Sequence, residues 1–468
     1  MIHMSNIKKQ YINDKMQFGK KQKWAFGMGS FAQWFINSAF NIWIFTFYFT
    51  AVGLSTYYIM LAYVIWSLWN GINDPLIGYL SDRTNTKYGR RKPFIMAATI
   101  PLLILEIVVW LPNPGNNWIN FLYLLIMLFC YDTVYTCIAL PYDSLFPELY
   151  TSVEERSEVN TIKQILSVVG LIFAALVPGL FIDMFGGSTE TFGYLINGVV
   201  TSIIVGISLL VSLKWGVTER EEFKLDHRQE FKFFENIKYT LKNKAFQLYS
   251  IMFFLYEYVL LLLGLIMPLF GKYVWGVGEF PTMIILGIMY IIGAVSVVLW
   301  RKLDLTIGSR KGYAISIVIY FISTLPIMLF QQYELAIVFS LFVGIGFGGM
   351  LYFIYLIIAD IIDEDELKTG KRREGAYFGV TNFFMRLSMI LSIVTVGFVF
   401  NMTQWETYDP TINPTIGLLI LFILFPGIAL GITLVCLYYY PFTKEKVNEI
   451  KEELEELHKE KLKKVRES

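Results

Sequence analysis

Several charged residues stand inside long apolar stretches of the sequence, where they can do chemistry with ions or protons. Four of them are singled out, Asp74, Asp132, Lys163 and Arg386. A charge at the centre of a membrane-spanning helix costs about 2.5 to 3.5 kcal/mol even on insertion-derived scales, so each is expected to face a partner or a water-filled cavity. A charge that only packs could be replaced by a less costly apolar residue. These four residues therefore lead the candidates for a functional site inside a membrane.

Amide side chains accompany these charges. Gln33, Asn37 and Asn41 recur every four residues and so lie along one face of a helix. Asn70 precedes Asp74 by one helical turn. A single amide often serves only as a contact between membrane helices, worth about 0.6 kcal/mol on average, so the stripe carries more weight than its members. The residues expected to bind substrate are Gln33, Trp34, Asn37, Asn70, Asp132, Tyr142, Lys163, Gln164, Tyr352, Asn382 and Arg386.

The composition limits the class of protein that positions these residues. Of 468 residues, 55% are hydrophobic and only 16% are charged, against about 25% charged in soluble domains. The net charge of +1 offers no basic footprint for nucleic acid. The three cysteines stand in apolar runs and the three histidines outside them, so no metal site and no nucleophile–base constellation is expected. The sequence predicts a membrane protein that is not an enzyme and has no cofactor.

Twelve apolar stretches are each long enough, or nearly so, to cross a bilayer, which takes about 20 residues. Hydrocarbon offers no partner for backbone N–H and C=O groups, so these stretches are predicted to be helices. The glycines at 344, 346, 348 and 349 fall within one of them and favour close helix packing over a phosphate-binding loop. The predicted spans are 24–52, 56–80, 94–111, 119–147, 159–184, 192–215, 246–272, 280–300, 312–330, 334–362, 374–401 and 414–440.

The chain also repeats itself after six predicted helices. Residues 82–84 read DRT and 89–92 read GRRK, while residues 304–306 read DLT and 308–311 read GSRK. A parallel duplication of six helices is typical of transporters whose halves rock about a site near the bilayer midplane. The predicted fold is therefore all-α and polytopic, with twelve transmembrane helices in two pseudo-symmetric six-helix bundles. The expected parts are an N-terminal segment 1–23, bundles 24–215 and 246–440, a central loop 216–245 and a charged tail 441–468.

The lysines and arginines predict the orientation of the chain. All but two of the 39 lie in the N-terminal segment, in alternate loops on the same side and in the tail. The exceptions are Lys272 and Arg386. Because loops rich in lysine and arginine stay in the cytoplasm, both termini are expected there, in a multi-pass protein of the cell membrane. The chain is expected to be a monomer.

Several motifs resemble those of a known transporter family. The sequence reads NGINDPLIG over residues 70–78, followed by DRT over 82–84 and GRRKP over 89–93. PYDSL follows over 141–145. These motifs resemble those of the glycoside–pentoside–hexuronide:cation symporter family, and the resemblance extends over essentially all twelve helices. It implies a major facilitator fold and cation-coupled transport of sugars or related compounds.

The match of residues to that family is incomplete. The resemblance implies that the family has carboxylates for sodium and sugar at the positions of Trp34, Asn70 and Ala139. The present sequence has none at these three positions, so of the pair of carboxylates on the second predicted helix it keeps only Asp74. Sodium prefers several oxygen ligands with negative charge among them, so proton coupling is expected in preference to sodium. The resemblance also matches Arg386 with an intramembrane lysine of the family. The residues expected to couple the cation are Asp74, Asn70, Asp132 and Asp143.

These features together predict a secondary transporter that moves a sugar, glycoside or related small solute by alternating access. The alternatives are a transporter of lysolipids or other amphiphiles with the same fold, or a membrane sensor that does not transport. Charged motifs at the cytoplasmic side are expected to latch the halves when the site opens outward. The residues expected to gate in this way are Asp82, Arg83, Gly89, Arg90, Arg91, Arg156, Asp304, Arg310 and Arg373.

Overall fold

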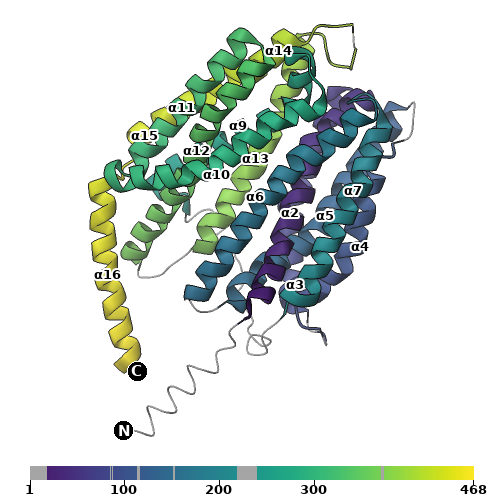
Figure 1. The fold of residues 1–468 in the computed structure, drawn as a ribbon. Helices are drawn as coiled ribbons and strands as arrows, with labels where there is room; N and C mark the ends of the chain where they lie inside the picture. The colour runs from purple at the N-terminus through teal and green to yellow at the C-terminus, as the bar shows by residue number, and fades with distance from the viewer. Residues whose placement is uncertain are drawn as a thin grey trace.

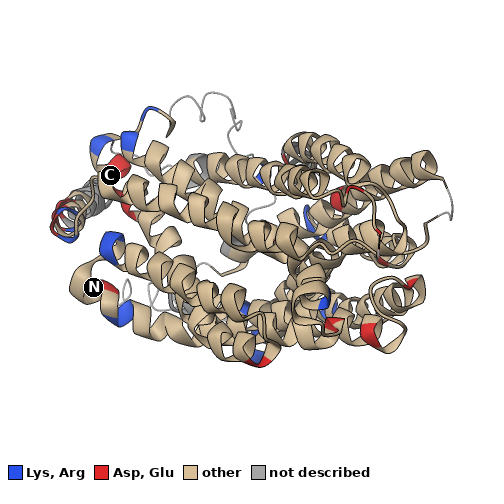
Figure 2. Ribbon diagram, turned by 90° about the horizontal axis from the view of Figure 1, so that it is seen from above, with Lys and Arg blue, Asp and Glu red and all other residues tan. Residues whose placement is uncertain are grey.

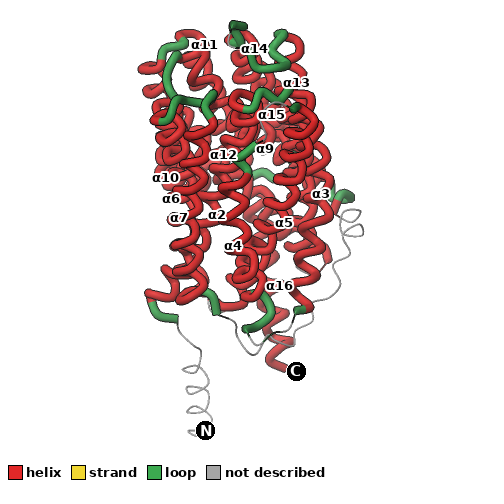
Figure 3. Tube along the Cα trace, turned by 90° about the vertical axis from the view of Figure 1, so that its right-hand side faces the viewer, coloured by secondary structure: helices red, strands yellow, loops and turns green. Residues whose placement is uncertain are grey.

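A computed structural model of the chain shows a bundle of long helices (Figure 1). The structure describes residues 18–84, 86, 88–112, 116–150, 153–218, 240–369, 374–409 and 411–467. Within these ranges Figure 3 shows helices joined by short loops and no strand, apart from one isolated bridge between Thr86 and Gly89. The all-α prediction is confirmed.

The first half of the chain contains six long helices that follow the predicted spans. Two of them continue into a single π-helical turn, Phe47–Ala51 after α2 and Ser212–Gly216 after α7. The helices are α2 (Lys20–Thr46), α3 (Thr56–Arg83), α4 (Lys92–Val108), α5 (Asn117–Leu149), α6 (Val153–Met184) and α7 (Thr191–Val211).

The second half repeats this arrangement. A π-helical turn, Gly271–Trp275, extends α9, and another, Ile420–Leu424, joins the last two helical pieces into one span. The helices are α9 (Lys244–Phe270), α10 (Glu279–Ile307), α11 (Ser309–Phe330), α12 (Tyr333–Thr369), α13 (Glu374–Met402), α14 (Thr415–Leu419) and α15 (Phe425–Tyr439). The tail forms α16 (Lys444–Glu467).

Judged by length and composition, nine of the described helices are long and apolar enough to cross a membrane. The other three of the twelve are α2, α3 and α4, with 27, 28 and 17 residues. Their lengths match the 17 to 25 residues or more that a span requires. Polar residues of the expected site stand in two of them, including Gln33 in α2 and Asn70 in α3, and lower the mean hydropathy there.

The two halves lie side by side in the bundle (Figure 1). Charged residues of the described chain gather mainly toward the ends of the helices, with a few in the middle (Figure 2). We call the end where α2 begins and α16 leaves the terminal end, and the opposite end the far end. Near the terminal end, Gly89 and Gly308 have φ of 105° and 81°. Gly89 lies three residues before α4 and Gly308 immediately before α11, which are the third helices of the two halves. This equivalence supports the internal repeat.

Small residues let helices pack closely within each half. A Cβ atom on Gly170 of α6 would lie 2.6 Å from the carbonyl oxygen of Phe31 in α2. In the second half, a Cβ atom on Gly346 of α12 would lie 2.5 Å from the backbone nitrogen of Tyr320 in α11. The glycine string of α12 therefore serves helix packing, as predicted.

At the far end the halves meet through two neighbouring sets of contacts. In the first, the backbone N–H of Thr56 at the start of α3 donates to Glu406 O beyond α13, at 2.9 Å. The ring of Phe49 packs there against Trp405 and Tyr408. In the second, the loop between α6 and α7 contacts the start of α10, where the Ser188 N–H donates to Glu279. The far end is thus closed.

Candidate functional site

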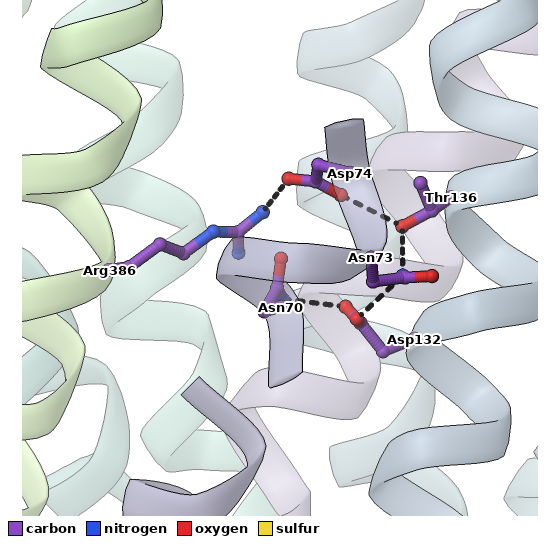
Figure 4. Close-up of polar contacts among 6 residues, drawn as sticks. All are labelled: Asn70, Asn73, Asp74, Asp132, Thr136 and Arg386. Atoms are coloured by element: carbon purple, nitrogen blue, oxygen red, sulfur yellow. Dashed lines mark hydrogen bonds and ion pairs between the residues drawn. The ribbon is translucent and has the colours of Figure 1, made fainter. Parts of the chain in front are cut away.

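An ion pair joins the two halves in the middle of the bundle (Figure 4). Nη2 of Arg386, on α13, lies 2.9 Å from Oδ2 of Asp74, on α3. Both side chains are partly buried, with 26% and 31% of their surface exposed. Two of the charged residues predicted from the sequence are therefore brought together from opposite halves of the chain.

A chain of hydrogen bonds runs from this ion pair into the first half (Figure 4). The Thr136 hydroxyl of α5 donates to Asp74 at 3.2 Å and accepts from the Asn73 amide at 3.2 Å. Asn73 also donates to Asp132 at 3.0 Å, and Asn70 donates to the other oxygen of Asp132 at 2.7 Å. Asp132 is therefore linked to the inter-half ion pair through side chains of α3 and α5.

Three residues of this network are almost completely buried, so an uncompensated charge there is unfavourable. Asn70, Asn73 and Asp132 are exposed by 1%, 0% and 7%. The side chains in Figure 4 carry two carboxyl groups and one guanidinium, so they have an excess negative charge when both carboxyls are ionised. Such a charge is costly in a place shielded from water unless it is compensated. One proton or one monovalent cation bound here restores neutrality.

Two members of this network, Thr136 and Asn73, are not among the residues predicted from the sequence. Thr136 follows Asp132 by four residues and so shares its helix face, which is the signal that could have singled it out. Threonine is common in membrane helices, where its hydroxyl often bonds within its own helix, and this obscures the signal. Asn73 lies in the NGINDPLIG motif, three residues after Asn70, but its place in the motif does not reveal its hydrogen bonds.

Lys163 and Asp143 form a separate pair nearer the terminal end. Nζ of Lys163 on α6 lies 3.1 Å from Oδ1 of Asp143 on α5, whose side chain is 62% exposed. The same ammonium group lies 4.7 Å from the ring centre of Phe146 and 5.2 Å from that of Tyr142. The neighbouring Gln164 is exposed. Asp143 is thus engaged with a lysine of its own half and lies outside the network of Figure 4.

The residues expected to line the amide face of α2 differ in their exposure and contacts. The Asn41 amide donates to the Asn37 backbone oxygen at 2.8 Å and to its side-chain oxygen at 3.1 Å. Gln33 is buried inside the first half, close to Tyr135. Trp34, in contrast, is 51% exposed. The residues expected to form one substrate-facing stripe therefore do not all face the same way.

The other expected substrate contacts lie in less central positions. Tyr142 is 1% exposed, stacks on Phe26 and donates to the backbone oxygen of that residue, so it packs α5 against α2. Tyr352 of α12 is half-buried and lies near Asp304 of α10. Asn382 is exposed on α13, one turn before Arg386.

The expected gating residues lie at the terminal end. Arg310 donates to the backbone oxygens of Leu437 and Tyr438, at 2.8 and 2.5 Å, and so caps α15 within its own half. Arg90 and Arg91 are buried, with 8% and 1% of their surface exposed. The side chains of Asp82, Arg83, Arg156 and Arg373 lie outside the described residues.

Comparisons with known proteins identify the family. The family described as MFS/sugar transport protein matches residues 25–444. The chain belongs to this family. This result confirms the resemblance to cation symporters and the major facilitator fold inferred from the motifs.

The relatives are similar over most of their length. YagG of Escherichia coli (strain K12), provisionally named a glycoside/cation symporter, is 22% identical over 94% of this chain and 95% of its own. The sodium-dependent lysophosphatidylcholine symporter 1-A of Danio rerio is 22% identical over 81% of this chain and 77% of its own. The crystal structure of the nucleoside transporter NupG superposes with a TM-score of 0.66 at 15% identity, over 90% of this chain and 100% of NupG.

These findings place the chain among transporters and not among enzymes. The likeness to NupG shows the fold alone. No cluster of three or more histidine, cysteine, aspartate or glutamate side chains that could hold a metal ion occurs in the described ranges.

Proposed function

We propose that the protein couples the movement of a proton to the transport of a sugar, glycoside or related small polar solute by alternating access. The observation that carries this proposal is the Asp74–Arg386 ion pair, because it is partly buried and joins the two halves. A bond between halves that must move apart has to be weakened at some point in the cycle. A proton that neutralises Asp74 does so, because the Arg386 guanidinium then faces an uncharged carboxyl.

The proposed coupling step uses the hydrogen bonds of the network. A proton that binds Asp132 or Asp74 removes the excess negative charge of the site. Protonated Asp74 holds the Arg386 guanidinium less tightly, so this arginine becomes available to substrate oxygens and the halves can rock. Release of the proton restores the ion pair and resets the cycle. The buried carboxyl Asp132 influences Asp74 through Asn73 and Thr136.

The proposed setting is the cell membrane, with the terminal end in the cytoplasm. The distribution of lysine and arginine supports this orientation. With the two halves in contact at the far end, the site is proposed to exchange with the cytoplasm in this state. The protein is proposed to act as a monomer with the bilayer as its surroundings.

Uptake into proteoliposomes tests the proposal. Purified protein is reconstituted, and uptake of labelled sugars and glycosides is driven separately by a proton gradient and by a sodium gradient. We expect the proton gradient to accumulate substrate and the sodium gradient to have no such effect. Accumulation driven by sodium alone would overturn the proton assignment, while exchange unaffected by either gradient would overturn coupling itself.

Two matched variants locate the coupling residue. Asp132→Asn removes the buried carboxyl of the network, and we expect gradient-driven accumulation to fall at least about tenfold while substrate exchange continues. Asp143→Asn changes a carboxyl of the same helix that is exposed and paired with Lys163, so accumulation should stay within about twofold of wild type. The reverse outcome would transfer the coupling role to Asp143.

An amphiphile is the second candidate substrate. It is favoured by the similarity to the lysophosphatidylcholine symporter of Danio rerio. A shift in the thermal unfolding temperature of the purified protein, measured in parallel with sugars, glycosides and lysolipids, distinguishes the two classes. Stabilisation by lysolipids alone would replace the sugar assignment.

A further inference from the structure

The far end of the bundle carries a set of contacts that the transport site does not use. Ser188, in the loop between α6 and α7, belongs to the first half, yet it is 1% exposed and inserted against the second half. Its backbone N–H donates to Oε1 of Glu279 at 2.7 Å. Its hydroxyl accepts from Nζ of Lys272 at 3.3 Å. Both partners belong to the second half, at the start of α10 and the end of α9.

The same loop is held firmly to its own half. The Ser188 carbonyl oxygen accepts hydrogen bonds from Thr50 at 2.5 Å and from Tyr194 at 3.2 Å. Every polar group of Ser188 is therefore engaged, with its carbonyl bound to the first half and its N–H and hydroxyl bound to the second. Movement of one half relative to the other acts directly on these bonds.

A second carboxylate makes the reciprocal contact. Asp183, at the end of α6 in the first half, lies against Gly278 of the second half, where a Cβ atom would collide with both carboxylate oxygens. Gly278 immediately precedes α10, whose N-terminus attracts negative charge because its N–H groups lack partners within the helix. Each half thus places a carboxylate against the backbone of the other half.

The loop needs glycine to make this approach. Gly186 and Gly187 have φ of 108° and 82°, a conformation that other residues rarely adopt. A Cβ atom on Gly187 would also lie 3.5 Å from a carboxylate oxygen of Glu279. The backbone of the loop therefore comes close enough to Glu279 for a direct hydrogen bond.

We propose that Asp183, Ser188 and Glu279 form a latch that holds the far end closed and sets the balance between the two open states of the transporter. The neighbouring contacts at Thr56 and Glu406 use backbone bonds and aromatic rings, so the charged contacts are concentrated in the latch. When the far end opens, α10 moves away from α6 and all the contacts of the latch break together. The latch rests on the rocking motion of the proposed function, but not on the identity of the substrate or of the coupling ion.

Distances between spin labels across the far end test the latch. Labels are placed at Asn117→Cys, at the start of α5, and Gln332→Cys, before α12, because both positions are exposed and belong to different halves. The natural cysteines Cys130, Cys137 and Cys436 are first replaced by alanine. In the parent protein we expect a short distance to predominate.

The variants separate the latch from nearby charges. In Asp183→Asn/Glu279→Gln the charge-assisted hydrogen bond to Glu279 and the carboxylate charge of Asp183 beside the start of α10 are lost, and we expect the ratio of long to short distances to rise about tenfold. The control is Glu190→Gln, an exposed carboxylate beside the same loop that contacts Gly186 of its own half, and it should match the parent. If the double variant fails to purify as a folded protein, Lys272→Ala replaces it, with an expected rise of about threefold.

The outcomes distinguish the latch from the proposed function. If Asp74→Asn shifts the distances and the latch variants leave them at parental values, the latch is wrong while the rocking motion stands. If neither Asp74→Asn nor any latch variant shifts them, the rocking motion fails and the latch fails with it. An equal shift in Glu190→Gln would also overturn the latch, because general loss of charge would then explain the effect.

Discussion

At the scale of single residues, the site depends on charges that balance only as a group. Asp74 and Arg386 compensate each other across the two halves, while Asp132 has amide and hydroxyl neighbours and no basic residue hydrogen-bonded to it in the network of Figure 4. Removing one member of an ion pair leaves the other charge without compensation, which is worse than removing both. This asymmetry can be measured.

The ion pair predicts a rescue by double substitution. Arg386→Gln is expected to lower the free energy of unfolding by about 1 kcal/mol, since the pair is partly exposed and therefore partly screened. Asp74→Asn/Arg386→Gln is expected to recover most of this loss, because neither member of the ion pair is then left without its partner. Thermal unfolding of the purified variants measures both effects.

A surface pair provides the control for this prediction. Lys368 and Glu364 lie 2.8 Å apart on α12, but the lysine side chain is 62% exposed. Lys368→Gln is expected to change stability by less than about 0.5 kcal/mol. A double variant at the central pair that is less stable than Arg386→Gln would contradict the proposed compensation.

Some residues of the candidate site could be predicted from the sequence and others could not, because residue types differ in how much they tell about their surroundings. A charge in an apolar run is costly and rare, so Asp74, Asp132 and Arg386 could be identified without a structure. Tyr142 was expected near substrate, but its ring stacks on Phe26 in the first half, because an aromatic side chain in a membrane helix packs equally well in either place. The type of a residue does not show whether its side chain faces the central site or a neighbouring helix.

At the scale of helices, hydropathy predicted the number and order of the spans but not their ends. The stretch 280–300 became α10, which continues to Ile307, and the stretch 334–362 became α12, which continues to Thr369. Hydropathy reports where lipid surrounds a helix, whereas the backbone hydrogen bonds continue into polar sequence beyond the bilayer. The π-helical turns, such as Phe47–Ala51, leave no trace in that pattern.

Helix packing provides a prediction at this scale. Gly170→Val introduces a branched side chain whose Cβ atom would lie only 2.6 Å from the backbone of α2. Because backbone atoms cannot move aside cheaply, we expect a loss of about 1 to 3 kcal/mol in stability and a lower unfolding temperature. Thermal unfolding of the purified variant measures the loss.

Gly264→Ala is the matched control for this substitution. No heavy atom lies within 4 Å of a Cβ at Gly264 of α9, so alanine is expected to be neutral or slightly stabilising. Equal destabilisation by both substitutions would show that glycine at these sites acts through backbone flexibility and not through close packing.

At the scale of the whole molecule, the contacts between the two halves and the packing of the tail helix bear on how the halves move. The halves meet through the central ion pair and through the contacts that close the far end. At the terminal end, α16 packs on the second half, with Ile450 and Leu454 buried and Lys451 Nζ 3.9 Å from Asp360. We therefore expect the tail helix to move together with α12 in the proposed rocking motion.

The orientation of the molecule gives the last prediction. If the terminal end lies in the cytoplasm, a membrane-impermeant maleimide added to intact cells will modify Gln332→Cys at the far end but not Glu452→Cys on α16. Both positions are exposed, so accessibility differs only through the membrane. Permeabilised cells provide the control, because both cysteines should then react. Labelling of Glu452→Cys alone in intact cells would invert the orientation, and the far-end latch would then close the cytoplasmic and not the outer side of the transporter.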